Sequence, residues 1–338
     1  MSKTRRTRNE KLEHLTNDFE KIKEIVVEEK MLLNVSNNTL KNYDKVFYAL
    51  QEYFEDKVNP FELTSKDAKD FVRFLQNDKI HYKDKLRNLN EQRGLKESTI
   101  NSYIKLAKTI YQTLLEEGYV ESNPFRTIKC LKRQNERIKT IPKEDIKKLL
   151  TSLDNEYYTD FRMYVAVNVL LDTFGRIGEV LNIKIEDIDF ENRTIFFPVT
   201  KNNDFRYVPF SKKTEKYILE FIDECRDMKS PYLFNDVNGN RWQEEAFRNS
   251  LKSYCEKFQI KTHITPHMFR HTASMIFLES GGNIRVLQKI LGHRKLSTTE
   301  IYAHVSDDLI AMQKENYGTV DQIMNNKKYQ RARSKRFR

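Results

Sequence analysis

Apolar residues recur at helical spacing in the first third of the chain. Residues 39–54 place apolar side chains on one face and lysines and glutamates on the other, which is typical of an amphipathic helix. The apolar face consists of Leu40, Tyr43, Phe47, Leu50 and Phe54.

Three more helices are predicted in the same region. One covers residues 19–27, and another begins at Thr64, whose hydroxyl can cap a helix that has Asp67 in its first turn. The next ends at Gly118, the residue type that best tolerates a left-handed helix end. Its apolar face consists of Ile100, Tyr103, Ala107, Ile110 and Leu114. These helices predict a compact all-helical unit.

The pattern changes after this unit. Residues 129–145 carry many charges and little apolar periodicity, which indicates a linker. We therefore predict a helical N-terminal domain at 1–128, a linker at 129–145, a second domain at 146–318 and a basic tail at 319–338.

The second domain mixes helices with a hairpin. A helix begins near Ile146, and residues 163–181 predict a long buried helix. Two short β-prone runs, 193–199 and 205–210, flank a turn rich in Asn and Asp, which predicts an antiparallel hairpin. Helices return at Glu244 and are predicted at 267–278, at 284–291 and from about Ser297. The expected fold class is mainly α with a small antiparallel β-sheet.

Charge narrows the choice of partners. The chain has 338 residues, a net charge of +11 and a pI near 9.2, so it is attracted to polyanions such as nucleic acid or acidic lipid surfaces. Its longest apolar run, residues 163–174, is too short to span a membrane, and the N-terminus has no secretory signal pattern. We expect a cytoplasmic protein without a membrane partner. Three widely spaced cysteines favour neither a disulfide framework nor a cysteine zinc site.

Histidines cluster in the last third of the chain. Five of the seven fall within about forty residues: His263, His267, His271, His293 and His304. His267 and His271 are four apart on a predicted helix, so a metal site is one alternative. The glutamate of an HExxH pattern is missing, however, and Arg270 lies between the two histidines. This disfavours a metal site, and we expect no cofactor.

Two arginines occur inside apolar segments. Arg176 follows an apolar stretch and is surrounded by glycines, and Arg270 lies among Met268, Phe269 and Met275. A buried guanidinium requires an anionic partner, and its planar fork matches phosphate oxygens. A tyrosine is a plausible nucleophile at such a phosphate, because a phenoxide forms more easily than an alkoxide.

These segments resemble the tyrosine recombinases, the phage-integrase and Xer-like family. The resemblance rests on TFGRIGEVLNIKIEDID, ITPHMFRHTASMIF, LQKILGHRKLSTTEIYAHV and the basic hairpin, all in the family's order across residues 140–310. One departure is Gly175, where the family more often has a larger apolar residue, and we expect looser packing there.

The resemblance implies a role for each matching residue. Arg176 and Arg270 would hold the scissile phosphate, and His293 would hydrogen-bond it. His267 would relay the tyrosine proton, and Lys201 would protonate the departing 5′ oxygen. Tyr302 would attack and form a 3′-phosphotyrosyl bond, without ATP or metal. Glu179 would support the site, and His271 and His304 would be structural.

The resemblance also implies an assembly. Two domains would form a C-shaped clamp around double-stranded DNA, and a homotetramer would exchange strands between two DNA sites. Residues 309–317 would contact a neighbouring protomer.

Two alternatives to a recombinase are a type IB topoisomerase, which relaxes supercoils as a monomer, and a catalytically silent DNA-binding regulator. The sequence names neither the DNA target nor the element served, and accessory proteins stay unknown.

The C-terminal tail generates a first testable prediction. Residues 327–338 contain seven basic residues and no acid, so they are either a solvated tail or an arm that contacts phosphates. If the tail contacts phosphates, deleting it will flatten the dependence of log affinity on log salt while cleavage persists. A tail of equal length with serine at the basic positions is the control and should behave like the deletion. An unchanged slope in both would show that the tail does not touch DNA.

Overall fold

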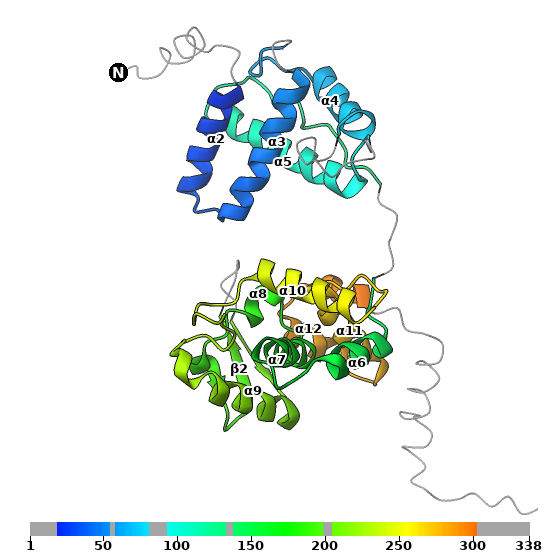
Figure 1. The fold of residues 1–338 in the computed structure, drawn as a ribbon. Helices are drawn as coiled ribbons and strands as arrows, with labels where there is room; N and C mark the ends of the chain where they lie inside the picture. The colour runs from blue at the N-terminus through cyan, green and yellow to red at the C-terminus, as the bar shows by residue number, and fades with distance from the viewer. Residues whose placement is uncertain (1–18, 55–57, 81–92, 133–137, 199–204, 303–338) are drawn as a thin grey trace, which may run out of the picture. The chain divides into compact units, whose positions relative to one another are not determined.

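The computed structural model describes residues 19–54, 58–80, 93–132, 138–198, 205–302, and these form two compact units. Unit 1 is Met1–Glu136 and unit 2 is Arg137–Arg338 (Figure 1). Together they are mainly helical with one small antiparallel sheet, which confirms the predicted fold class. No helix in the described part of the chain is long and apolar enough to cross a membrane.

Unit 1 is a group of helices around one apolar core. Its helices are α2 (Phe19–Leu32), α3 (Asn37–Phe54), α4 (Ser65–Asn77) and α5 (Glu97–Glu116). Thr64 caps α4 through a reciprocal capping box with Asp67, as the sequence predicts. Gly118, with φ of 75°, follows the end of α5 in the left-handed region, which confirms that prediction too.

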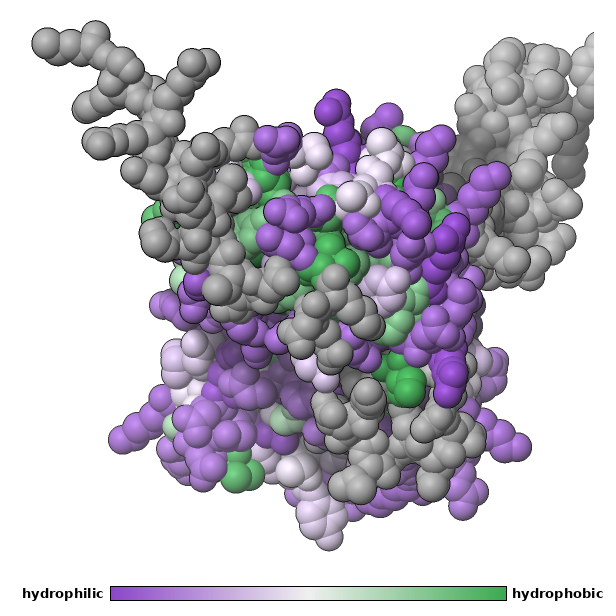
Figure 2. Space-filling model, turned by 90° about the horizontal axis from the view of Figure 1, so that it is seen from above, coloured by the Kyte–Doolittle hydropathy of each residue, from purple (hydrophilic) through white to green (hydrophobic). Residues whose placement is uncertain are grey.

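The face of the molecule in Figure 2 is mostly hydrophilic. Hydrophobic residues form small separate patches on it. Larger exposed apolar side chains do occur at the end of α2, where Met31, Leu32 and Leu33 are all exposed.

The segment between the units is held at both ends. The Asn101 side chain exchanges two hydrogen bonds with the Leu131 backbone in unit 1. In unit 2 the Ile141 side chain is buried, and its backbone N–H donates to the Thr272 hydroxyl at 2.8 Å. Residues 133–137 lie outside the described part, so the predicted linker bounds of 129–145 stay a prediction.

Unit 2 surrounds a central helix, α7, which Figure 1 shows nearly end-on among its neighbours. Its helices are α6 (Lys143–Ser152), α7 (Tyr158–Thr173), α8 (Ile177–Val180), α9 (Lys212–Glu224), α10 (Glu244–Lys257), α11 (Pro266–Glu279) and α12 (Ile284–Leu291). Four short 3₁₀ turns complete it: η1 (Ile185–Asp187), η2 (Arg226–Met228), η3 (Leu296–Thr298) and η4 (Glu300–Tyr302). α7 is buried on nearly all sides against α9 and α11.

The sheet has three strands in the order β1 (Ile188–Asp189), β2 (Thr194–Phe197) and β3 (Arg206–Pro209), all antiparallel. The pair β2 and β3, in the register Ile195 to Val208, confirms the strands of the predicted hairpin. Its turn, with Lys201, lies outside the described residues.

The predicted long helix over residues 163–181 is wrong. α7 ends at Thr173, and Phe174 adopts a left-handed conformation with φ of 54° before the chain enters α8. The apolar composition on both sides hides this break, because burial requires apolar residues whether or not the helix continues. The break places Arg176 in extended backbone directly before α8.

Gly175 also differs from expectation. A Cβ atom there would lie 2.6 Å from Cγ2 of Val180, so the backbone at the break is tightly packed rather than loose. The helix predicted from Ser297 is replaced by the turns η3 and η4.

Candidate active site

The break after α7 brings two arginines to one place. Nη1 of Arg270, on α11, donates to the Phe174 carbonyl at 2.7 Å, and its Nη2 donates to the Leu291 carbonyl at 2.8 Å. The Phe174 carbonyl is free to accept because the helix has ended there. The Arg270 side chain is 6% exposed, whereas that of Arg176 is 40% exposed and open to a ligand.

A buried carboxylate, Glu179, connects these arginines. It accepts from Nη1 of Arg176 at 2.8 Å and from the Arg176 backbone N–H at 2.8 Å. It also accepts two hydrogen bonds from Arg206 of β3, at 2.7 and 3.1 Å, and lies 4.0 Å from Arg270. One negative charge thus faces three guanidinium groups, which leaves an excess of positive charge at the site.

Burial and the neighbouring arginines act in opposite directions on the pKa of the Glu179 carboxyl. Burial by itself would raise this pKa, but the hydrogen bonds and charge of Arg206, together with Arg176, lower it to about 2. Burial and the charge of Arg176 lower the pKa of Arg270 to about 10, and the group stays positive at neutral pH.

His293 contacts Arg270 directly. Its Nε2 lies 3.2 Å from Nη2 of Arg270, and its Nδ1 lies 2.9 Å from the Thr299 hydroxyl. Because a guanidinium can only donate, Nε2 accepts and Nδ1 carries the hydrogen. Burial and the charges of Arg270, Arg176 and Arg206 lower the pKa of His293 to about 4. The ring is therefore neutral at physiological pH.

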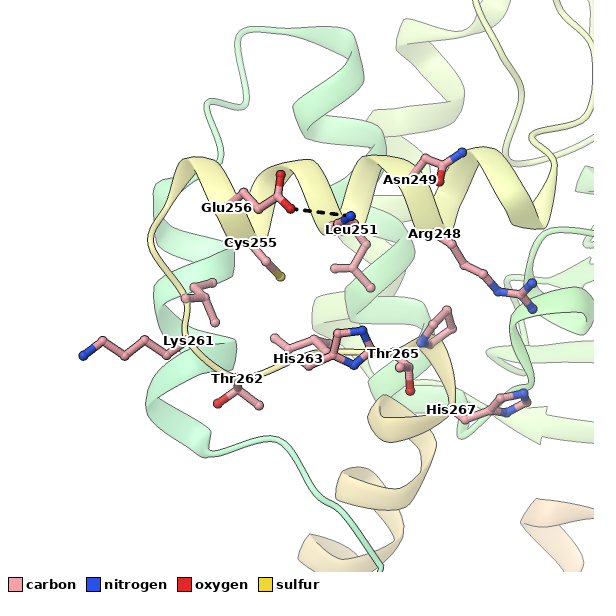
Figure 3. Close-up of a pocket in the computed structure, with 14 residues that line it drawn as sticks. Arg248, Asn249, Leu251, Cys255, Glu256, Lys261, Thr262, His263, Thr265 and His267 are labelled. Atoms are coloured by element: carbon pink, nitrogen blue, oxygen red, sulfur yellow. Dashed lines mark ion pairs between the residues drawn. The ribbon is translucent and has the colours of Figure 1, made fainter. Parts of the chain in front are cut away.

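His267 lies at the N-terminal end of α11, beside a pocket of about 590 Å³ between α10 and the loop that leads into α11 (Figure 3). Figure 3 shows Arg248 of α10 and His267 at the same end of this pocket. Partial burial of the ring and the charges of Arg248 and Arg270 lower the pKa of His267 below its usual value.

Tyr302 lies at the end of η4 and is 3% exposed. Its ring packs in a small apolar cluster with Leu287 and Leu291 of α12. Its hydroxyl lies 2.7 Å from Nδ1 of His271. Burial raises the pKa of the Tyr302 phenol, while Arg270 and Ser274 partly oppose this. The Tyr302 phenol thus lies close enough to Arg270 and Arg176 for their charges to lower its pKa.

The structure brings together Arg176, Arg270, His293 and Tyr302, with His267 at the edge of the same cluster. It adds Arg206 and His271, which sequence reasoning left out of the site. Strand alternation places Arg206 on the inward face with the buried Val208 and Phe210, although it does not show that this face meets Glu179. Lys201 and His304 lie outside the described residues.

Known proteins share both the sequence pattern and the fold. Residues 139–308, half of the chain, match the model of the phage integrase family, and residues 19–135 match the phage integrase SAM-like domain. The chain is 28% identical over 290 residues to tyrosine recombinase XerC of Bacillus pumilus (strain SAFR-032), covering 80% of this chain and 94% of that protein. It is 24% identical over 281 residues to tyrosine recombinase XerD of Listeria monocytogenes serovar 1/2a (strain ATCC BAA-679 / EGD-e), covering 80% and 89%.

Solved structures agree on the fold. The Tn1549 transposon integrase in complex with transposon right end DNA has a TM-score of 0.67 at 21% identity, covering 88% of this chain and 99% of that chain. The XerH site-specific recombinase bound to palindromic difH substrate has a TM-score of 0.67 at 17% identity, covering 89% and 85%.

The fold and the sequence match together define a DNA breaking and rejoining enzyme. The chain belongs to the phage integrase family, and it is a site-specific tyrosine recombinase. These comparisons favour neither the topoisomerase nor the silent regulator.

The buried carboxylate generates a stability prediction. Glu179→Gln removes the negative charge that three arginines share, so we expect it to lower the free energy of unfolding at pH 7 by about 3 kcal/mol. The lowered pKa of Glu179 stabilises the fold above the ordinary glutamate pKa, and this stabilisation is lost as the pH falls toward 2. The difference between wild type and variant should therefore shrink from pH 7 to pH 3 in urea unfolding.

Glu186→Gln is the matched control, because that carboxylate is exposed and pairs with Lys184 at the surface. It should change stability by no more than about 0.5 kcal/mol at either pH. Equal effects of the two variants would contradict the role given to Glu179.

Proposed function

We propose that this recombinase cleaves DNA with Tyr302 as nucleophile and with Arg176, Lys201, His267, Arg270 and His293 as the other catalytic residues. The proposal rests on one observation: three other residues of the site lie around the guanidinium of Arg270. Its guanidinium contacts His293, lies close to Glu179, and is near enough to the Tyr302 phenol to lower that group's pKa. A phosphate bound there is within reach of a nucleophile.

The charge balance of the site supports this assignment. In-line attack on a phosphodiester builds negative charge on the non-bridging oxygens, and fixed guanidinium groups stabilise that charge. Arg270 is fixed by two backbone carbonyls, and Arg176 is oriented by Glu179 while it stays partly exposed. The two arginines would each bind a non-bridging oxygen.

His293 and His267 would approach the scissile phosphate from different sides of the site. His293, beside Arg270, would hydrogen-bond a non-bridging oxygen. His267, whose pKa responds to the charges of Arg248 and Arg270, would contact the phosphate from the N-terminal end of α11. The family resemblance gave His267 the tyrosine proton, whereas the imidazole within hydrogen-bond distance of the Tyr302 hydroxyl is that of His271.

We also propose the assembly that the family resemblance implies. Residues 1–128 and 146–318, joined by the linker, would clamp double-stranded DNA, and a homotetramer on two sites would exchange strands. We further propose that the enzyme serves a mobile element, as the printed name of one structural neighbour, the Tn1549 transposon integrase, suggests. We also propose that it acts in the cytoplasm. A two-site recombination assay, run beside a supercoil-relaxation assay, tests the assembly: recombinant product from paired sites supports it, and relaxation alone contradicts it.

Tyr302 generates the central prediction. Tyr302→Phe should bind DNA normally and form no covalent adduct, because the attacking oxygen is missing. A library of nicked duplexes supplies the substrate, and denaturing gels with sequencing of the trapped ends identify the adduct and the target. Tyr157→Phe, which changes an exposed tyrosine, is the control and should form adduct at the wild-type level. Adduct from Tyr302→Phe would move the nucleophile elsewhere, with Tyr317 the next candidate.

Lys201 generates a prediction about the leaving group. A departing alkoxide has a parent pKa near ~15.7 and needs a proton, whereas a thiolate, with a pKa of about 8.5, leaves without one. Lys201→Ala should cleave ordinary DNA very slowly and recover most of its rate on DNA with sulfur at the 5′ bridging position. Arg176→Ala should gain less from the sulfur. Equal recovery of both variants would mean that Lys201 contacts DNA without acting as the acid.

A further inference from the structure

His271 makes the hydrogen bond that bears most directly on the proposed nucleophile. It lies on α11, one position after Arg270, and its Nδ1 is 2.7 Å from the Tyr302 hydroxyl. The two ring centroids are 5.6 Å apart and the ring planes are tilted by 47°, so the imidazole is in direct contact with the phenol. Both groups are shielded, since Tyr302 is buried and His271 is partly buried.

The protonation state of the ring decides whether His271 can accept this hydrogen bond. Burial, together with the neighbouring His267 and the charge of Arg270, lowers the pKa of His271 below its usual value, so the ring is neutral at physiological pH. A neutral imidazole offers one unprotonated nitrogen as an acceptor. In the tautomer that carries its hydrogen on Nε2, Nδ1 accepts the hydrogen bond that the Tyr302 hydroxyl donates.

A base is needed at this position. A phenol with a pKa of 10 or more is less than about one part in a thousand ionised at pH 7, and burial raises the pKa of Tyr302 further. The arginines that face the phenol only partly oppose that effect. The attacking oxygen must therefore lose its proton to a neighbour as it attacks.

We propose that His271 is the group that accepts the Tyr302 proton during DNA cleavage, an inference that rests on the proposed role of Tyr302 as nucleophile. The Oη–H bond breaks and an Nδ1–H bond forms, while Oη bonds to phosphorus and the bond from phosphorus to the 5′ oxygen breaks. The leaving oxygen takes its proton from the general acid, proposed above as Lys201. In religation the protonated His271 returns the proton to the departing tyrosine oxygen.

The charged groups around His271 and Tyr302 determine how the cleavage rate depends on pH. The ionisable groups near the pair are His267 and Arg270 on α11, Arg176 before α8, and Tyr302 itself on η4. Since the neutral ring is the base, single-turnover cleavage should rise with pH as His271 loses its proton. The midpoint of this rise should lie below about pH 6.5, because burial and the charge of Arg270 lower the pKa of His271.

The test uses the full chain and the nicked duplex that sequencing of the wild-type covalent adducts identifies. His271→Ala should slow single-turnover adduct formation by about 10²- to 10⁴-fold, the range typical of a lost general base. Added imidazole should restore the rate in proportion to the neutral form of imidazole. His271→Gln should stay slow, because its amide keeps a hydrogen bond to the phenol but cannot take the proton. Thermal melts and DNA affinity check that both variants fold.

Two controls separate this inference from the proposed function. His263→Ala removes an exposed histidine in the loop before α11 and should cleave at the wild-type rate, with no response to imidazole. Tyr302→Phe should form no adduct with or without imidazole. If Tyr302→Phe forms adduct, the proposed nucleophile is wrong whatever His271 does.

The remaining outcomes decide the role of His271. A His271→Ala rate within threefold of wild type overturns the proposal. A slow His271→Ala that imidazole does not rescue, together with a His271→Gln near the wild-type rate, also overturns it and leaves His271 as a residue that only orients the phenol. If His271→Ala does not fold, the rate and the pH profile of His271→Gln decide: a slow variant without the rise below pH 6.5 supports the proposal, and a wild-type profile overturns it.

Discussion

The charged site of this recombinase depends on one buried carboxylate. Glu179 accepts hydrogen bonds from Arg176 and Arg206 and lies within ion-pair distance of Arg270. These arginines come from the start of α8, from β3 and from α11, which are far apart in the sequence. Without a shared negative charge, three guanidinium groups could not be held together in a poorly solvated place. The carboxylate therefore makes the concentration of positive charge stable before DNA is present.

Arg270 shows how the site is fixed before its ligand arrives. Its two terminal nitrogens are held by the carbonyls of Phe174 and Leu291, and one of them also reaches His293. Both carbonyls stand at helix ends, where no helical partner occupies them. Secondary structure thus supplies the acceptors that orient the guanidinium, and little rearrangement is needed when a phosphate binds.

Much of this arrangement could be predicted from the sequence. The expected helix at 284–291 coincides with α12, because the apolar period is clear and Gly292, with φ of 65°, ends it. The arginines could be found because a cation inside an apolar segment needs an anionic partner. The end of α7 could not be found, since the buried residues on both sides of the break are equally apolar.

Two site residues were missed for a different reason. Arg206 becomes part of the site only through a long-range contact with Glu179, 27 positions away in the sequence. His271 was taken as structural, and its hydrogen bond to Tyr302 spans 31 positions. Local periodicity places a side chain on a face of its own element, but it does not say which distant group that face meets.

The left-handed residue at the end of α7 bears on which sequences this site tolerates. Arg270 is bound by the backbone oxygen of Phe174, so the identity of that side chain is free as far as the guanidinium is concerned. What the position requires is a φ of 54°, which glycine and asparagine adopt with little strain and valine and isoleucine do not. Substitution at residue 174 should therefore disfavour β-branched residues. Backbone shape imposes this restriction on a residue whose side chain packs against Phe277 and takes no part in the chemistry.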